Sequence, residues 1–581
     1  MALKKLLVYL RGYRRECVLA PLFKMLEATF ELIVPLIVAA IIDKGIPDNR
    51  GYIVRMCLCL VALGGIGLVA AVAAQYFSAR AAIGFATGVR HGLMKHIQTL
   101  SYTELDQVGT STLITRMTSD VNQMQTGVNM TLRLLLRSPF VVFGAMVMAF
   151  TIDTQCALIF VGVIAVLLVI VFGIMALTIP MYRKVQGQLD QVTAATRENL
   201  TGVRVVRAFC EEDEQNRRFV GLNQLLTKMQ LAVGRISAVM NPATYVVINA
   251  AVTLLIHTGA MQVEAGVLTQ GQVVALYNYM SQILVELVKM ANLIITLTKA
   301  VASAGRVSRV MDVTTSQEDG TACIPENAPH GSVRFDHVSL RYKGAGDESL
   351  TDITFTAEPG ETIGVIGGTG SGKSTLVNLI PRFYDATAGQ VLVDGMDVTQ
   401  LRKSELRRRI AVVPQKAMLF KGTIRSNLLW GRADATEDEL RQALSTAQAL
   451  DVVESKPKGL DEPVEQGGRN FSGGQRQRLT IARALVSRPE ILILDDSASA
   501  LDYATDARLR RAIRAMENPP TTFIVSQRAA SIRFADRIIV LDDGAVAGIG
   551  THEQLLESCP TYQEIYASQF ETKDKEAVQH G

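Results

Sequence analysis

Six long apolar stretches dominate the first half of the chain and predict a membrane domain. They lie at about residues 17–42, 53–78, 134–152, 155–179, 241–263 and 272–297. Each stretch is close to the ~20 residues that an α-helix needs to cross a bilayer. The connections between them alternate in length. The short connections are 43–52, 153–154 and 264–271, and the long polar ones are about 79–133 and 180–240.

The distribution of basic residues predicts the orientation of these spans. Both long connections are rich in Lys and Arg, whereas the short ones contain only Lys44 and Arg50. Basic residues next to spans stay in the cytoplasm, so the long connections, the N-terminus and the C-terminal half are predicted to be cytoplasmic. Residues 1–16 are basic and apolar, and they form either a short amphipathic helix on the inner membrane surface or a plain charged flank. We predict a multi-pass protein of the cytoplasmic membrane.

Ionisable residues interrupt two of the predicted spans. Lys24, Glu27 and Glu31 share one face of the first span, and Glu286 and Lys289 lie near the middle of the sixth. Charges inside a membrane are costly, and they usually face water or each other. These residues therefore form either two local ion pairs or a polar wall of a substrate pathway.

The second half of the chain has a different pattern. Residues 312–332 are polar and contain Pro and Gly, which is typical of a linker. From residue 333 onwards, apolar runs alternate with helical stretches, which predicts an α/β domain with an antiparallel β portion at its start. We predict a transmembrane domain over 1–311, a linker over 312–332, an α/β domain over 333–570 and a loose tail over 571–581.

Composition and charge narrow the class of protein. Hydrophobic residues make up 49% of the 581 residues, and the formal net charge is only +4, so a nucleic-acid partner is not expected. The closest cysteines, Cys57 and Cys59, lie inside an apolar run with no other metal-binding residues nearby, so they are expected to pack as small apolar side chains. We expect no cleavable signal peptide, because the first apolar run is too long for one and lacks a small-residue cleavage site.

A phosphate-binding motif gives the α/β domain its chemistry. Gly367–Thr375 fits G-x-x-x-x-G-K-[ST], between an apolar run at 362–366 that predicts a strand and a segment at 375–380 that predicts a helix. Its backbone N–H groups are expected to surround phosphate oxygens. Lys373 would reach the β- and γ-phosphates, and Ser374 would bind Mg²⁺. The predicted loop contacts are Gly367, Thr369, Gly370, Ser371, Gly372, Lys373, Ser374 and Thr375.

With the stretches Phe471–Arg478 and Ile491–Asp496 added, the C-terminal third resembles the ATP-binding cassette (ABC) family. The resemblance implies ATP and Mg²⁺ as cofactors. It assigns Tyr342 to adenine stacking, Gln415 to the Gln-loop, and Ser472, Gly473, Gly474 and Gln475 to the signature that contacts ATP held by a partner. It also assigns Asp495 to Walker B, with Ser374 and Gln415 beside it at Mg²⁺, and Asp502 to the D-loop Ser499–Asp502.

The membrane half resembles the exporter type of the same family. Glu198–Phe209 is similar to the family's second cytoplasmic connection. The resemblance implies that the tips near 103–112 and 203–214 are coupling helices that dock on nucleotide domains, although plain solvated helix–helix turns are the alternative. Because the chain carries one phosphate loop and one signature, it is expected to be half of a transporter and to pair with a second half in the bilayer.

Two catalytic positions depart from the family pattern. The residue after Asp495 is Asp496 where Glu is usual, and the switch position is Gln527 where His is usual. Gln466 also replaces a common Glu before an otherwise intact signature. This combination resembles the degenerate subunit of a heterodimeric exporter of small, amphipathic or drug-like molecules. The alternatives are a homodimeric exporter of lipid, peptide or siderophore, and a membrane regulator that binds ATP without productive turnover.

Overall fold

The computed structural model describes residues 5–46, 50–325 and 330–579, with the side chains of residues 498 and 571–579 left out. Two compact units divide the chain. The first contains residues 1–98 and 108–313, and the second contains residues 99–107 and 314–581. Lys4, one of the basic residues of the N-terminal segment 1–16, lies outside the described residues. The predicted tail begins within a helix, α22 (Pro560–Gln579), and its last two residues are not described.

The first unit is entirely helical over its described residues. Six of its helical segments are long and apolar enough to span a membrane, which confirms the six predicted spans. The elements are η1 (Leu7–Tyr13), α2 (Arg14–Ala40), η2 (Ile41–Gly45), α4 (Arg50–Ile97), α6 (Thr110–Thr115), η3 (Arg116–Asp120), α7 (Val121–Leu134), α8 (Arg137–Ile152), α9 (Thr154–Thr201), α10 (Val203–Ala208), α11 (Glu212–Glu264) and α12 (Gln270–Met311).

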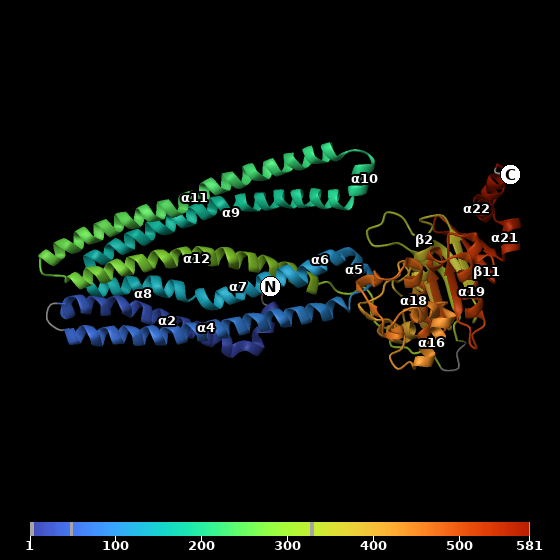
Figure 1. Ribbon diagram of the computed structural model, residues 1–581, viewed down its shortest axis with the longest axis horizontal. Helices are drawn as coiled ribbons and strands as arrows, with labels where there is room; N and C mark the ends of the chain where they lie inside the picture. Colours follow the sequence, from blue (N-terminus) through green and yellow to red (C-terminus); the bar gives the residue numbers. More distant parts are fainter. Residues whose placement is uncertain (1–4, 47–49, 326–329, 580–581) are drawn as a thin grey trace. The chain divides into compact units, whose positions relative to one another are not determined.

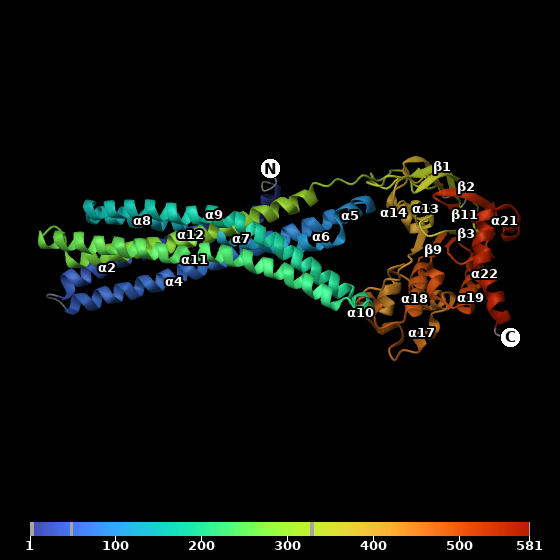
Figure 2. The ribbon, with the colours of Figure 1, turned by 90° about the horizontal axis from the view of Figure 1, so that it is seen from above.

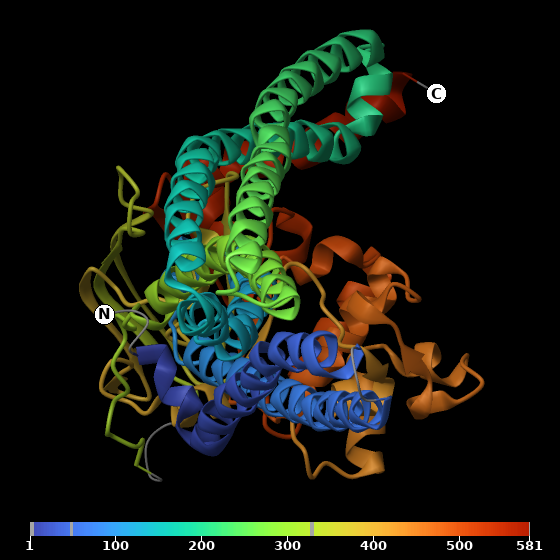
Figure 3. The same ribbon diagram turned by 90° about the vertical axis from the view of Figure 1, so that its left-hand side faces the viewer.

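These helices pack as long antiparallel neighbours. Helix α9 runs beside α11, and α2 runs beside α4, as the views along and across the bundle show (Figures 1 and 3). Helix α9 has 48 residues, so it is ~72 Å long and far exceeds the ~30 Å of a hydrocarbon core. A buried apolar cluster that includes Phe160, Leu255 and Tyr279 joins α9, α11 and α12. The helices therefore continue well beyond the apolar stretches that predicted them.

The second unit contains two main sheets. A four-stranded antiparallel sheet has the order β2-β1-β4-β5, and a six-stranded sheet has the order β12-β11-β3-β10-β9-β6. In the larger sheet all neighbouring pairs are parallel except β11 with β12. The α/β domain with an antiparallel portion at its start is therefore confirmed. Figure 2 shows β1 and β2 on one side of the parallel strands and α18 on the other.

The strands are β1 (Val333–Leu340), β2 (Leu350–Ala357), β3 (Thr362–Gly367), β4 (Ala388–Val393), β5 (Met396–Asp397), β6 (Ile410–Val413), β7 (Gly422–Thr423), β8 (Pro463–Val464), β9 (Ile491–Asp495), β10 (Thr521–Val525), β11 (Arg537–Asp542) and β12 (Ala545–Gly550). The central strands β3 and β10 are buried along their whole length, as expected for parallel strands covered on both faces.

The helices of this unit connect the strands and cover the sheets. They are α5 (Tyr102–Val108), α13 (Lys373–Leu379), α14 (Lys403–Arg409), α15 (Ile424–Leu428), α16 (Glu437–Thr446), α17 (Leu450–Glu454), η4 (Gly459–Asp461), η5 (Gln466–Gly468), α18 (Gly473–Val486), η6 (Ser497–Ala500), α19 (Tyr503–Arg514), α20 (Ala529–Ile532), α21 (His552–Ser558) and α22. Helix α5 comes from the first long connection, so this unit is built from two separate stretches of sequence.

Candidate functional site

The phosphate loop lies between strand β3 and helix α13, at the carboxyl end of the parallel sheet. Ligands bind at this edge in open α/β sheets. Helix α13 begins at Lys373, two residues earlier than the segment that predicted it. Gly372 has φ +90°, and a Cβ there would lie 2.6 Å from the carbonyl oxygen of Ser349. A side chain at this position would therefore collide with the strand-side loop, so glycine is required.

Lys373 is buried inside this loop. Its Nζ donates to the carbonyl oxygens of Gly367, at 3.0 Å, and Gly368, and lies 3.3 Å from the Ser371 Oγ. Burial lowers the pKa of Lys373, although the nearby carboxylates of Asp496 and Asp495 oppose that shift. Carbonyl dipoles compensate the ammonium only partly, so the side chain is suited to an anionic ligand such as a phosphate group.

Two side-chain pairs lie beside the loop. The Ser374 Oγ donates to Asp495 Oδ1 at 2.9 Å, and the Gln415 Nε2 donates to Asp496 Oδ2 at 3.1 Å. Burial raises the pKa of Asp495, and the Asp496 carboxylate raises it further, against the hydrogen bond from Ser374. Hydroxyl and carboxylate oxygens crowded in this way form the donor set that Mg²⁺ prefers.

These groups share one cavity of about 300 Å³. Its lining includes Thr369, Gly370, Gly372, Lys373, Ser374, Thr375, Gln415, Asp495, Asp496 and Gln527, together with Ser349, Val525 and Ser526. The sequence analysis missed the last three. Ser349 precedes strand β2 with no motif around it, but Val525 and Ser526 directly precede Gln527 at the end of β10. The sheet order, with β10 next to β3, could have located them.

Tyr342 lies at the side of this cavity. Its hydroxyl donates to Thr375 Oγ1 at 3.1 Å, which holds the ring beside the first turn of α13. Burial raises the pKa of Tyr342, so the hydroxyl stays protonated near neutral pH. The position next to the phosphate loop is compatible with stacking on a base whose phosphates lie at Lys373.

Backbone geometry fixes Asp496 and a hydrogen bond to a backbone carbonyl fixes Gln527. Asp496 has φ +46°, a left-handed conformation that turns the chain sharply after strand β9. The carbonyl oxygen of Gln527 accepts from Gln569 Nε2 at 2.7 Å, which fixes the end of strand β10 to helix α22. Asp502 caps helix α19 by accepting from the Thr505 backbone N–H at 2.8 Å, and this bond lowers the pKa of Asp502.

The signature residues lie apart from this cavity. Ser472 is the N-cap of α18, where its Oγ accepts from the Gln475 backbone N–H and the Gln475 side chain accepts from the Ser472 N–H. Ser472 and Gly473 are exposed, and Gly474 and Gln475 are half-buried. None of the four lines the phosphate-loop cavity. The described part of the chain therefore presents them at the exposed N-terminus of a helix, where backbone N–H groups attract anions.

The ionisable residues of the membrane helices are joined by a residue that the sequence analysis missed. Arg137, at the start of α8, is ion-paired with Glu286 and lies 2.5 Å from Glu31. Glu286 also accepts from Lys289 at 2.8 Å. Both local pairs that the sequence predicted are therefore present, Lys24–Glu27 and Glu286–Lys289. Arg137 adds a link between α2 and α12, because it joins Glu31 to the second pair in one linked set.

Exposure divides the members of this set. Arg137 and Glu286 are buried, whereas the side chains of Glu31 and Lys289 are 41% and 42% exposed. Lys24 and Glu27 form a separate pair, 2.6 Å apart, one turn before Glu31 on α2. The carboxylate of Glu286 therefore stabilises helix packing, and Glu31 and Lys289 are the members that other molecules can reach in this chain.

The cytoplasmic tips also have distinct placements. The first predicted tip is helical as α5, and the Asp106 carboxylate in it accepts from the Tyr384 hydroxyl at 2.7 Å. This contact lies within the second unit, so the first tip docks on the α/β domain. The second predicted tip forms α10, which is mostly exposed within the first unit. Its docking stays a prediction.

Comparisons with known proteins agree with this architecture. Residues 17–287 match the family described as ABC transporter transmembrane region, and residues 350–499 match the family described as ABC transporter. The chain is 37% identical over 574 residues to an uncharacterized ABC transporter ATP-binding protein of Mycobacterium tuberculosis, covering 98% of each chain. It is 29% identical over 538 residues to an ATP-dependent lipid A-core flippase of Hahella chejuensis, covering 92% of this chain and 91% of the relative.

The fold has a solved counterpart. It is similar to the structure of a bacterial Atm1-family ABC exporter with ATP bound, with a TM-score of 0.78 over 96% of this chain and 98% of that chain. The two sequences are 24% identical, so this likeness concerns the fold alone.

Proposed function

Because this chain belongs to the ABC transporter family, we propose that it is the degenerate-site subunit of a heterodimeric exporter. Membership of the family establishes the general function. The chain is an exporter half-transporter, a multi-pass membrane protein with an ATP-binding domain, and its activity is ATP hydrolysis coupled to transport. Exporters of this family work as dimers in a lipid bilayer. The proposal concerns the partner and the division of labour between two ATP sites.

The observation that carries the proposal is the composition of the phosphate-loop cavity. Asp496 and Gln527 line the same cavity as Lys373, so both substitutions act on one ATP. Asp496 has a carboxylate one methylene shorter than the usual Glu and is already engaged by Gln415. Gln527 cannot carry a positive charge or relay a proton. Phosphoryl transfer depends on positioning and electrostatics, so each change is expected to slow hydrolysis at this site.

The residues that we propose as metal ligands lie close together. Ser374 and Asp495 already meet at 2.9 Å, and Gln415 lies beside the neighbouring carboxylate. We propose that these three residues hold Mg²⁺ when ATP is bound, and that the metal neutralises phosphate charge there. The raised pKa of Asp495 fits this role, because a cation would relieve the repulsion between two adjacent carboxylates. The site should therefore bind Mg-ATP well and turn it over slowly.

The intact signature serves the other site. Ser472–Gln475 lie outside this chain's own cavity, at the exposed start of α18. We propose that they face ATP held by the partner's phosphate loop, where the Ser472 hydroxyl and the helix N-terminus stabilise the γ-phosphate. By the same symmetry, the partner's signature would cover the ATP at Lys373. One composite site then clamps the two halves together, and the other hydrolyses.

The cargo is proposed to be amphipathic. The similarity to the lipid A-core flippase of Hahella chejuensis supports this class, and so do the charged residues of the membrane helices. We propose that Glu31 and Lys289, whose side chains are exposed, line the pathway nearest to the polar part of the cargo, together with the partly exposed Lys24 and Glu27. Glu286, also predicted there, is buried and stabilises helix packing instead. The location is proposed to be the cytoplasmic membrane, with the nucleotide domain inside the cell, on the evidence of the basic long connections.

The steady-state ATPase of two variants, each paired with wild-type partner, tests the proposal. Gly473→Asp places a negative charge against the partner's ATP and is expected to abolish turnover. A Cβ at Gly473 has no neighbour within 4 Å, so the substitution fits within this chain. Lys373→Ala weakens only the slow site, so turnover is expected to fall partially. If Lys373→Ala is as inactive as Gly473→Asp, the degenerate-site proposal is wrong and a homodimeric exporter is favoured.

A further inference from the structure

Aromatic rings connect the side of the nucleotide cavity with helix α5. The rings of Tyr342 and Tyr384 meet edge to face, with centroids 5.0 Å apart and an interplanar angle of 89°. The Tyr384 hydroxyl then donates to Asp106 Oδ2 on α5 at 2.7 Å. Tyr102, also on α5, packs on Phe383 with ring centroids 4.7 Å apart. All of these residues belong to the second unit, so the connection is internal to one compact body.

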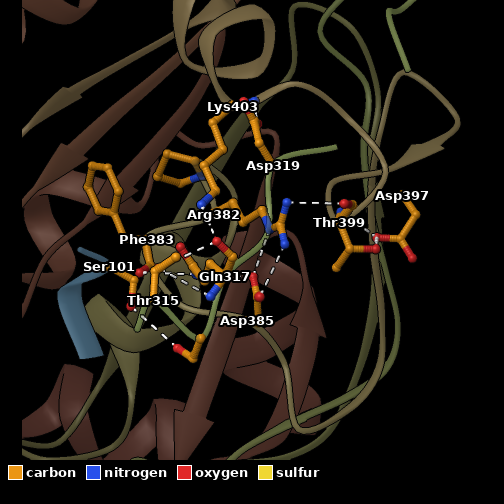
Figure 4. Close-up of polar contacts among 12 residues, drawn as sticks. Ser101, Thr315, Gln317, Asp319, Arg382, Phe383, Asp385, Asp397, Thr399 and Lys403 are labelled. Carbon is orange, nitrogen blue, oxygen red and sulfur yellow. Dashed lines mark hydrogen bonds and ion pairs between the residues drawn. The ribbon is translucent and has the colours of Figure 1, made fainter. Parts of the chain in front are cut away.

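The loop that carries Tyr384 is held by a network of hydrogen bonds. Arg382, 4% exposed, adopts φ +53° and bonds Asp385 at 2.8 Å. Its carbonyl oxygen accepts from Arg407 at 2.9 Å, and the Gln317 Nε2 donates to Asp385 at 3.0 Å. Figure 4 shows this network converging from the linker and the loop. Because these bonds fix the backbone of Tyr384, a displacement of its ring is expected to move its side chain and hydroxyl rather than its backbone.

Helix α5 is anchored at its opposite end. Glu104, 3% exposed, accepts from the backbone N–H groups of Ser101 and Ser316, both at 3.2 Å. This anchors the first turn of α5 to the linker. The last turn, by contrast, carries the exposed Asp106, which accepts a hydrogen bond from the Tyr384 hydroxyl. The position of the last turn therefore depends on where the Tyr384 hydroxyl points.

The hydroxyl of Tyr384 remains protonated and can therefore donate a hydrogen bond. Burial, followed by the hydrogen bond to Asp106, raises its pKa, so the phenol keeps its proton throughout the physiological range. A hydrogen bond from a neutral hydroxyl to a carboxylate is stronger than one between neutral groups. This bond is long-range in sequence, because 278 residues separate the two partners.

We propose that Tyr384 is a positioning residue that couples the base of the bound nucleotide to helix α5. A base stacked on Tyr342 fixes that ring, the fixed ring sets the edge contact with Tyr384, and the Tyr384 hydroxyl holds Asp106. The signal depends on the base and not on the phosphates at Lys373. It rests only on ATP binding at this loop, and it applies whether the partner chain is identical or not.

Hydrogen exchange of the full chain in lipid nanodiscs, followed over the peptide that covers α5, tests this coupling. The non-hydrolysable ATP analogue AMP-PNP is expected to slow exchange of α5 amides by about tenfold, the effect of ordering one charge-assisted hydrogen bond. Inorganic tripolyphosphate, which has no base, is expected to leave exchange unchanged. Tyr384→Phe, which removes only the hydroxyl, is expected to lose the response to AMP-PNP.

A matched control lies in the same aromatic cluster. Within the described residues the Tyr102 hydroxyl makes no hydrogen bond, so Tyr102→Phe removes a hydroxyl without breaking such a bond and is expected to retain the wild-type response. Coupling is reciprocal, so Asp106→Asn and Tyr384→Phe should each weaken AMP-PNP binding by the factor by which they reduce its effect on α5, with tripolyphosphate binding unaltered.

Binding of radiolabelled nucleotide, measured in parallel, separates the possible failures. If AMP-PNP binds to Tyr384→Phe and protects α5 as in the wild type, or if tripolyphosphate protects α5 equally, the coupling does not run through Tyr384 and the inference is overturned. If the wild type does not bind AMP-PNP at all, the nucleotide site itself is wrong, which overturns this inference together with the proposed function.

Discussion

Tyr342 illustrates how much a single ring is expected to contribute. Tyr342 does not line the phosphate-loop cavity itself, but its hydroxyl donates to Thr375, which does. Tyr342→Ala is expected to weaken ATP binding by ~1–2 kcal/mol, the scale of an aromatic contact. Tyr342→Phe keeps the ring and should stay near the wild-type affinity. Equilibrium binding of ATP to the three proteins provides the measurement, and equal losses in both variants would exclude stacking as the cause.

Arg137 is expected to matter for stability more than any other charge in the membrane helices. Arg137→Leu leaves the buried Glu286 carboxylate without its buried cationic partner, a change that typically costs ~3–5 kcal/mol. Thermal unfolding in detergent should show a clear drop in midpoint. The double variant Arg137→Leu with Glu286→Leu removes both charges and should recover most of the loss. A double variant that is less stable than Arg137→Leu alone would contradict a pairwise role.

The same residue shows where sequence analysis reaches its limit. The phosphate loop could be predicted because its groups are adjacent in sequence, and the whole motif lies within Gly367–Thr375. Arg137 could not, because its partners Glu31 and Glu286 are 106 and 149 residues away. Only packing brings these three side chains together. The adjacent pair Glu286 and Lys289 was predictable from helical spacing, but its link to Glu31 was not.

At the scale of elements, the N-terminal helix η1 packs into a row of small residues on α4. A Cβ at Gly84 would lie 2.0 Å from the Tyr13 ring, and a Cβ at Gly92 would lie 2.0 Å from the Tyr9 hydroxyl. Gly88, between them, also borders Tyr9. The glycines, spaced four residues apart, leave a groove that two tyrosine side chains fill. This contact attaches η1 to α4.

Substitution of Gly84 by Ala should displace Tyr13 and lower the thermal midpoint, although Ala favours helix by ~1 kcal/mol over Gly. Gly64→Ala is the matched control on the same helix, because a Cβ there meets nothing within 4 Å. The control should be neutral or stabilising, and the difference between the two midpoints measures the packing. Identical midpoints would mean that η1 does not rest on α4 in the membrane.

Element boundaries show why hydropathy predicted the spans but not the helices. The apolar stretch at 155–179 ends where a bilayer would end, yet α9 continues to Thr201. Beyond the bilayer, a helix needs one apolar stripe rather than apolar residues all round. Gln188, Val192 and Ala195 are buried on that stripe, whereas most of the surrounding positions are exposed. Because most residues of this segment are polar, its buried stripe does not form a continuous apolar run in the sequence.

At the scale of the whole molecule, the two departures from the catalytic pattern predict a gain of function. If this site is slow as proposed, Asp496→Glu together with Gln527→His should raise its rate of hydrolysis by at least about tenfold, because a positioned acid or base contributes that much or more. The measurement uses a dimer whose partner has lost its own catalytic Glu, so that only the restored site can turn over. The single variants are the controls, and each alone should give a smaller gain. No gain in the double variant would mean that Gln466 or the partner's signature limits the site.

The α/β unit is not contiguous in sequence, because residues 99–107, which lie between helices α4 and α6, belong to it. A fragment that begins at residue 333 would lack α5 and would present Phe383 and Tyr384 to solvent without their cover. Uncovered aromatic surface promotes self-association. A soluble fragment for biophysical work is therefore better built by fusing the α5 segment ahead of Thr314, so that α5 covers these aromatic side chains.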